Sequence, residues 1–101
     1  MLAFERTRVA SIVKAVCDSF TQPATAEEIR TKVFEKVKEL RFAVAGDDQP
    51  GDTQRKELER WGMCWDPAEG LEAFARRRFS VIICDQVAHE LKLRGLFRGN
   101  P

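Results

Sequence analysis

The stretch TAEEIRTKVFEKVKEL, residues 25–40, carries the clearest structural signal in the chain and decides its fold class. Thr25 is a favoured helix N-cap, and Glu28 lies three residues further on, which is the spacing of a capping box. In this motif each of the two side chains accepts a hydrogen bond from a backbone N–H at the helix start. Apolar residues then recur at four-, four- and three-residue spacing: Ile29, Val33, Val37 and Leu40. The stretch therefore predicts an amphipathic helix with one face in a core.

The residues before this stretch predict another helix, over residues 2–20. Its apolar residues recur at three- and four-residue spacing and line one face: Val9, Ile12, Val13, Val16 and Phe20. Pro23 follows shortly, and a proline disfavours helical backbone in the residue before it. We therefore expect this helix to end before Pro23.

The residues after the stretch break the helical pattern. The segment GDDQPGD, residues 46–52, is rich in turn-forming residues, so we expect a mobile loop over residues 43–53. A short helix over residues 53–61 should follow. It should stop at Gly62, because glycine is common just past a helix C-terminus.

The next segment predicts a helix that starts at Asp66. Asp66 is a favoured N-cap, Pro67 is a favoured first helical residue, and Glu69 lies three residues after the cap. We expect this helix to turn three apolar side chains inward: Leu71, Phe74 and Phe79.

The run Val81-Ile82-Ile83-Cys84 is open to two interpretations. Runs of β-branched residues favour a short buried strand. We favour instead a helix over residues 80–94, because Ile83, Val87 and Leu91 recur every four residues. Gly95 would then end the helix and Leu96 would contact Leu91, as in a Schellman motif. Residues 96–98 could be extended.

Length and composition agree with a single domain over residues 1–101. The chain has 101 residues, a common size for one domain, and its apolar fraction of 44% is ordinary for a globular protein. We therefore expect a mainly α fold: a compact bundle of four to five helices, with a short β element near the C-terminus as an option. No stretch approaches the roughly 20 apolar residues that a membrane span needs, so we expect no membrane partner.

The cysteines and the histidine do not have the spacing of a metal or catalytic site. Cys17, Cys64, Cys84 and His89 match the ligand count of a Cys₃His zinc site, but no two cysteines are close in sequence. Cys84 and His89 are five residues apart and would point away from each other on a helix, so they would not form a nucleophile–base pair. We expect no metal, no cofactor, no small-molecule substrate and no enzyme activity.

The odd number of cysteines and the charged N-terminus indicate reduced thiols in a cytoplasmic protein. The charges of the whole chain nearly balance, with 17 basic and 16 acidic residues. Their distribution is uneven: residues 72–101 hold six basic and three acidic residues, or +3, whereas residues 47–71 hold three basic and seven acidic residues, or −4. A basic surface of this protein that binds a partner should therefore be formed by the two ends of the chain rather than by its middle.

The run Arg76-Arg77-Arg78 is the sharpest local feature. Three consecutive helical side chains fan over about 200°, so at least two can reach one partner. Three interpretations are open: a solvated helix face, a contact with nucleic-acid phosphates, or a contact with an acidic protein surface, including the chain's own residues 47–72. We expect most of the guanidinium groups to reach solvent.

Two tryptophans flank a turn. Trp61 shares a helix with Leu58, so we expect it in the core. Trp65 precedes Asp66 and Pro67 in a turn, where a chain usually runs on the surface. We expect Trp65 to be partly exposed and to contact a partner.

Two parts of the chain resemble parts of a winged helix-turn-helix domain. The segments SIVKAV, residues 11–16, and PATAEEI, residues 23–29, are similar to the first two helices of such regulators. The segment VAHELKLRGLFR, residues 87–98, resembles the end of a recognition helix and its turn into the wing. The resemblance implies that four side chains would face the major groove of DNA: Asp85, Gln86, His89 and Lys92.

We therefore expect a small, non-enzymatic regulatory module that binds DNA. Its expected contact residues are Arg76, Arg77, Arg78, Trp65, Gln86, His89 and Lys92. The alternative is a protein-binding adaptor or inhibitor, of the kind that phages and mobile elements carry, which occupies an acidic partner surface. Phosphate binding would show a steep salt dependence, whereas a tryptophan-anchored protein interface would not.

Overall fold

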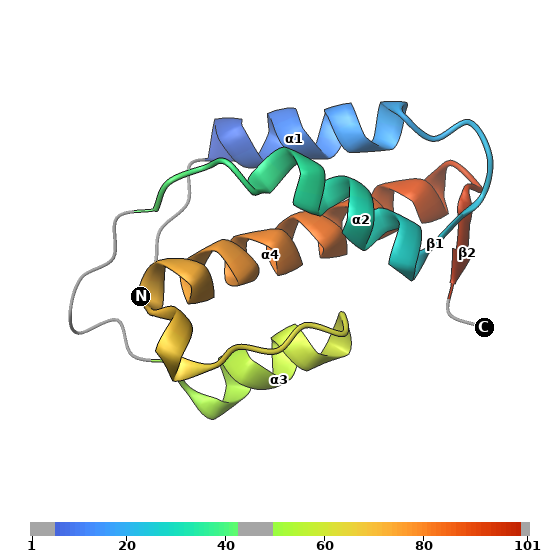
Figure 1. The fold of residues 1–101 in the computed structure, drawn as a ribbon. Helices are drawn as coiled ribbons and strands as arrows, with labels where there is room; N and C mark the ends of the chain where they lie inside the picture. Colours follow the sequence, from blue (N-terminus) through green and yellow to red (C-terminus); the bar gives the residue numbers. More distant parts are fainter. Residues whose placement is uncertain (1–5, 43–49, 100–101) are drawn as a thin grey trace.

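One long helix, α4 (Leu71–Leu93), crosses the middle of the molecule, and the other elements pack around it (Figure 1). The structure is a computed structural model that describes residues 6–42 and 50–99. The other elements, in chain order, are α1 (Arg6–Asp18), β1 (Ala24–Thr25), α2 (Ala26–Val37), α3 (Asp52–Arg60), the 3₁₀ helix η1 (Pro67–Glu69) and β2 (Phe97–Gly99). The predicted fold class, mainly α with a short β element near the C-terminus, is confirmed.

The prediction of two helices in the C-terminal third is wrong, because α4 is continuous through Phe79 and Ser80. The run Val81–Cys84 is helical, as we favoured, and not a strand. This run of apolar, β-branched residues fits a helix because α1, α2 and α3 all contact α4. Burial therefore extends around much of the circumference of α4. Its buried residues are Phe74, Ala75, Phe79, Ser80, Val81, Ile83, Cys84, Val87, Ala88 and Leu91.

The predicted capping box of α2 is confirmed. The backbone N–H of Glu28 donates to Thr25 Oγ1 at 3.2 Å, and the backbone N–H of Thr25 donates to Glu28 Oε1 at 3.1 Å. The apolar stripe of this helix is buried against α4: Ile29, Val33 and Val37. The helix ends earlier than the pattern indicated, so Leu40 lies beyond it and is half-buried.

The predicted helix over residues 2–20 is α1, which covers residues 6–18; residues 2–5 lie outside the described part of the chain. Most of the predicted loop over residues 43–53 also lies outside it, and its last residues, Asp52 and Thr53, belong to α3. The helix predicted to start at Asp66 is a single 3₁₀ turn. It has the expected capping box, but the positive φ of Gly70, 87°, interrupts the helical conformation before α4 begins.

Both α3 and α4 end in a glycine with positive φ, as predicted. After α4, Gly95 has φ 73°, its N–H donates to the Lys92 carbonyl, and the Leu96 N–H donates to the Leu91 carbonyl at 2.7 Å. This is the bonding pattern of a Schellman motif. It turns the chain so that β2 runs parallel to β1, with Ala24 opposite Phe97. The end of α4 is thereby held beside the start of α2.

Within the described residues, no helix is long and apolar enough to cross a membrane.

Candidate nucleic-acid interface

A concave surface lies where the start of α2, the end of α3, the second half of α4 and β2 meet. It consists of two hollows of about 330 and 310 Å³ that share Ala26, Arg60 and Trp61. We call this surface the Trp61 cleft. Its lining residues are Thr25, Ala26, Glu27, Arg30, Arg60, Trp61, Gly62, Asp85, Ala88, His89, Lys92 and Phe97.

Trp61 is held in the cleft by hydrogen bonds at both its backbone and its ring. Its indole N–H donates to Asp85 Oδ1 at 2.8 Å, and its carbonyl accepts from Arg30 Nη1 at 2.9 Å. Gly62 permits the second contact, because a Cβ at this position would collide with the Arg30 guanidinium. Trp61 is half-buried, so the expectation that it belongs to the core is only partly right.

Three of the four positions that the winged-helix resemblance implies line the Trp61 cleft. Asp85, His89 and Lys92 are all exposed on α4 and lie on its cleft side. Gln86 is also exposed, but it does not line the cleft. Asp85, His89 and Lys92 are spaced by four and three residues, so they share one helix face.

Asp85 is already occupied by neighbours within the chain. In addition to the Trp61 indole, its carboxylate accepts a hydrogen bond from Arg60 Nη2 at 3.1 Å. Lys92 has a different environment, because its ammonium lies 5.1 Å from the centre of the Phe97 ring. The Lys92 side chain is exposed despite this contact, so an anion can reach its ammonium.

The charge of the cleft has a small positive excess. Arg30, Arg60 and Lys92 oppose Glu27 and Asp85, so three basic side chains face two acidic ones. At the start of α2, hydrogen bonds from the Thr25 backbone and side chain lower the pKa of Glu28, and the positive charge of Arg98 on β2 lowers it further.

The three consecutive arginines do not form the solvated cluster that we expected. Arg76 and Arg77 lie in the first half of α4, away from the cleft, and their side chains are only 27% and 26% exposed. Arg78 is also half-buried. The expectation that most of these guanidinium groups reach solvent is only partly right, because α4 has neighbours on several sides and all three residues are half-buried.

The two paired arginines connect α4 to other parts of the chain. Arg76 Nη2 donates to the Leu40 carbonyl at 2.8 Å and lies 3.8 Å from Glu72 Oε1. Arg77 donates to Glu69, and this bond lowers the pKa of that carboxyl. The acidic partners are therefore from the chain's own residues 47–72, which is one of the interpretations that the sequence left open.

Trp65 packs against the core from the side of η1 and is not part of the cleft. Its ring meets the Phe74 ring edge-on, at a centroid distance of 5.0 Å, and its indole N–H donates to the Gly70 carbonyl. The expectation of partial exposure is confirmed, since Trp65 is half-buried. Its predicted contact with a partner stays a prediction.

Cys17 and Cys84 are not activated nucleophiles. Cys17 and Cys84 are fully buried, and burial raises the pKa of Cys84 to about 12 and also raises that of Cys17. Both are therefore thiols at neutral pH, and only a thiolate attacks efficiently. In the part of the chain that the structure describes, no group of three potential metal ligands gathers.

Sequence reasoning missed Arg30, Arg60 and Trp61 as members of one surface. Arg30 carried no signal, because it is one of many charged residues on a solvated helix face. What unites the three residues is the packing of α2 and α3 on α4, which brings together residues about thirty positions apart.

Comparisons of this chain with protein-family models, with curated proteins and with solved structures found no match.

Proposed function

We propose that this protein is a small, non-enzymatic DNA-binding module that holds the duplex against the Trp61 cleft. The supporting observation is that Asp85, His89 and Lys92, chosen from the winged-helix resemblance, line one concave surface with Arg30 and Arg60. Cationic side chains next to exposed hydrogen-bonding side chains are what DNA recognition uses, since phosphate contacts position a protein and base contacts specify the site.

The side chains in and beside the cleft have three roles under this proposal. Lys92 and Arg98 bind phosphates, because both are exposed and the Lys92 ammonium lies against the Phe97 ring at the cleft. Gln86 and His89 reach base edges, where amide and imidazole groups can donate and accept. Arg60 and Asp85 orient Trp61, which closes one side of the cleft.

The alternative function, a protein-binding adaptor or inhibitor, drew on the two tryptophans and on the near-neutral charge of the chain. Both tryptophans are half-buried and both indole N–H groups donate to acceptors within the chain, so we favour DNA binding. The free thiols of Cys17, Cys64 and Cys84 fit the cytoplasmic location that the proposal implies.

The first test uses two lysines that occupy the same place in their helices. Lys92 lies in the last turn of α4, in the cleft, and Lys36 lies in the last turn of α2, outside it. Fluorescence anisotropy with a labelled random-sequence duplex should show weaker binding for Lys92→Gln than for Lys36→Gln. The slope of log affinity against log salt should become shallower by about 0.9 for Lys92→Gln, since one phosphate contact is lost.

Both lysines lie near the negative end of a helix dipole, so general effects of charge removal cancel in this comparison. Equal losses for the two variants would show that the cleft is not the binding surface. Failure of the wild-type protein to bind duplex DNA in low-salt buffer would overturn the proposed function itself.

A further inference from the structure

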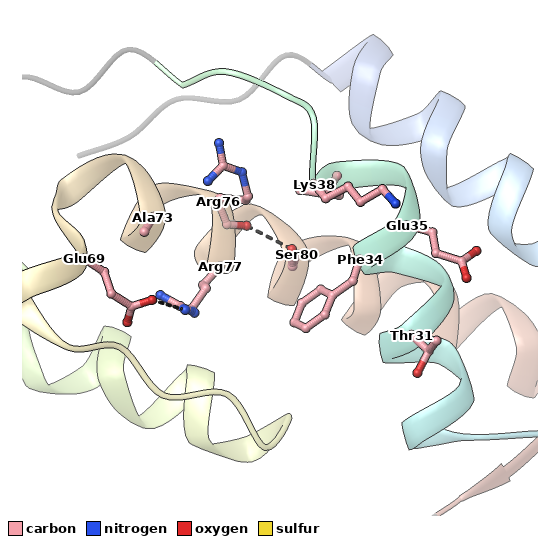
Figure 2. A pocket seen from close by; sticks show the side chains of 10 residues that line it. Thr31, Phe34, Glu35, Lys38, Glu69, Ala73, Arg76, Arg77 and Ser80 are labelled. Atoms are coloured by element: carbon pink, nitrogen blue, oxygen red, sulfur yellow. Dashed lines mark hydrogen bonds and ion pairs between the residues drawn. The ribbon is translucent and has the colours of Figure 1, made fainter.

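A groove separates the second half of α2 from the first half of α4 and is closed at one end by η1 (Figure 2). We call it the Phe34 groove. Its volume of about 490 Å³ falls within the range of roughly 300–1,000 Å³ that is typical of small-molecule sites. Its lining residues are Thr31, Phe34, Glu35, Val37, Lys38, Glu69, Ala73, Arg76, Arg77 and Ser80.

Phe34 is an unusual residue for its position. It is 39% exposed, and only one other large apolar side chain of the described residues, Leu93, is exposed. Phe34 follows Val33, which is buried, so it lies about 100° around the helix from the face that packs on α4. The core therefore does not need a large aromatic ring here, and a polar helix-forming residue would fit equally well.

The opposite wall of the groove is made by one stripe of α4. Ala73, Arg77 and Ser80 are spaced by four and three residues, so they share a helix face. Ala73 and Ser80 are small, which leaves room beside the stem of Arg77. Figure 2 shows Phe34 extending from α2 toward this stripe, while the guanidinium of Arg76 points away from the groove.

Arg77 is one of three cationic residues that line the groove, with Arg76 and Lys38, and its hydrogen bonding is incomplete. One nitrogen, Nη2, donates to Glu69 at the η1 end. The other, Nη1, is buried and has no acceptor among the described residues. A buried donor without an acceptor is unfavourable, so a rotation of the Arg77 side chain that brings this nitrogen to a ligand oxygen in the groove would be favourable. Guanidinium and carboxylate match in shape and charge, which makes a carboxylate the best acceptor.

We propose that the Phe34 groove binds a small amphipathic carboxylate, whose anionic head bonds to Arg77 and whose apolar body lies between Phe34 and Ala73. A neutral apolar molecule would leave the Arg77 donor unsatisfied. A small hydrophilic anion would leave the Phe34 ring in water. This inference does not depend on DNA binding, because the groove and the Trp61 cleft share no lining residue.

The test is calorimetric titration with octanoate as the probe and 1-octanol as its neutral counterpart. Octanoate should bind saturably with one site per chain and more tightly than 1-octanol. Backbone amide NMR signals of Phe34, Ala73 and Arg77 should shift during the titration, while those of α1 should not. Equal affinity for the two probes, or shifts that do not map to the groove, would overturn the proposal.

Two pairs of variants separate the groove from general effects. Arg77→Gln should weaken octanoate binding at least tenfold, or about 1.4 kcal/mol, while Arg78→Gln, the neighbouring arginine, should leave it unchanged. Phe34→Gln should weaken the binding of both probes, while the same change at the other exposed apolar residue, Leu93→Gln, should not. If Arg77→Gln does not fold, the Phe34 and Leu93 pair still decides.

A second copy of the chain is the competing occupant of the groove. Sedimentation of the wild-type protein and of Phe34→Gln distinguishes the two occupants. A monomeric wild-type protein is the expected result. A wild-type dimer that Phe34→Gln converts to a monomer would overturn the proposal, because the groove would then be an interface between copies.

Discussion

At the scale of single residues, Asp85 shows how one side chain organises the cleft. Its two carboxylate oxygens accept from different groups, Oδ1 from the Trp61 indole and Oδ2 from Arg60, and so hold the end of α3 against α4. A residue that looks like an ordinary exposed acid in the sequence is therefore the connection between two helices. The same residue was expected to face DNA, and its acceptors are already used.

Asp85→Ala should loosen Trp61 without unfolding the protein. It removes two hydrogen bonds of an exposed group, so the free energy of unfolding should fall by only about 1 kcal/mol. In a Trp65→Phe background the remaining tryptophan emission reports on Trp61, and it should shift to longer wavelength as the indole meets more water. Glu59→Ala, which changes an exposed acid on α3 outside the cleft, should leave the emission unchanged. An unshifted spectrum for Asp85→Ala would contradict the role of this hydrogen bond.

At the scale of elements, each helix combines local end signals with a face chosen by packing. In α2 the signal for the helix start is local, because the capping box of Thr25 and Glu28 spans only four residues. The stripe of Ile29, Val33 and Val37 supplies the packing energy, because all three side chains are at most 1% exposed. Helices of this length are marginal alone in water, so the packed face provides most of their stability.

The stability of α2 should reflect this division between cap and core. Thr25→Ala should lower the free energy of unfolding by about 1 kcal/mol, because it removes the acceptor for the Glu28 N–H. Ile29→Ala should lower it by roughly 2–4 kcal/mol, because it opens a cavity against α4. Urea unfolding followed by circular dichroism measures both. A larger loss for Thr25→Ala than for Ile29→Ala would contradict the packing described here.

At the scale of the whole molecule, α4 forms the centre of the core and carries both candidate sites. The Phe34 groove uses its first half and the Trp61 cleft its second half, with α2 forming part of both. Cys17 on α1 and Cys84 on α4 are fully buried, and the Cys17 thiol contacts the carbonyl of Val87 on α4 at 4.0 Å. The reactivity of these thiols therefore reports on the opening of the whole core.

Thiol reactivity should separate the three cysteines into two classes. Cys64 is exposed and should react with a thiol reagent such as Ellman's reagent while the protein is folded. Cys17 and Cys84 are inaccessible and have raised pKa values, so they should react only as fast as the core opens. Counting fast and slow thiols in native buffer, and then in denaturant, measures this. Three fast thiols under native conditions would contradict the packing of α1 on α4.

Local signals account for what the sequence predicted correctly. The capping box at Thr25 and Glu28 and the glycine stops at Gly62 and Gly95 depend on contacts within a few residues. The helical periods of α1 and α2 also predicted their buried faces, because one-sided burial leaves a clear pattern. The end of α2, the helix expected from Asp66 and the start of α4 were not predicted correctly, and the largest error was in α4. A helix buried around much of its circumference has no single apolar stripe, and its β-branched run resembles a strand.

The sequence by itself determined that the fold is mainly helical and where the capping box and the glycine stops lie, because these features depend on interactions between near neighbours in the chain. Only the tertiary structure decided which charges remain available. The sequence left open whether Arg76 and Arg77 are solvated or paired, and in the folded chain Leu40, Glu69 and Glu72 are their partners. The Trp61 cleft and the Phe34 groove are likewise tertiary, because each joins residues from helices that meet only after packing. Such contacts depend on how the helices are placed around α4, and no window of neighbouring residues encodes that placement.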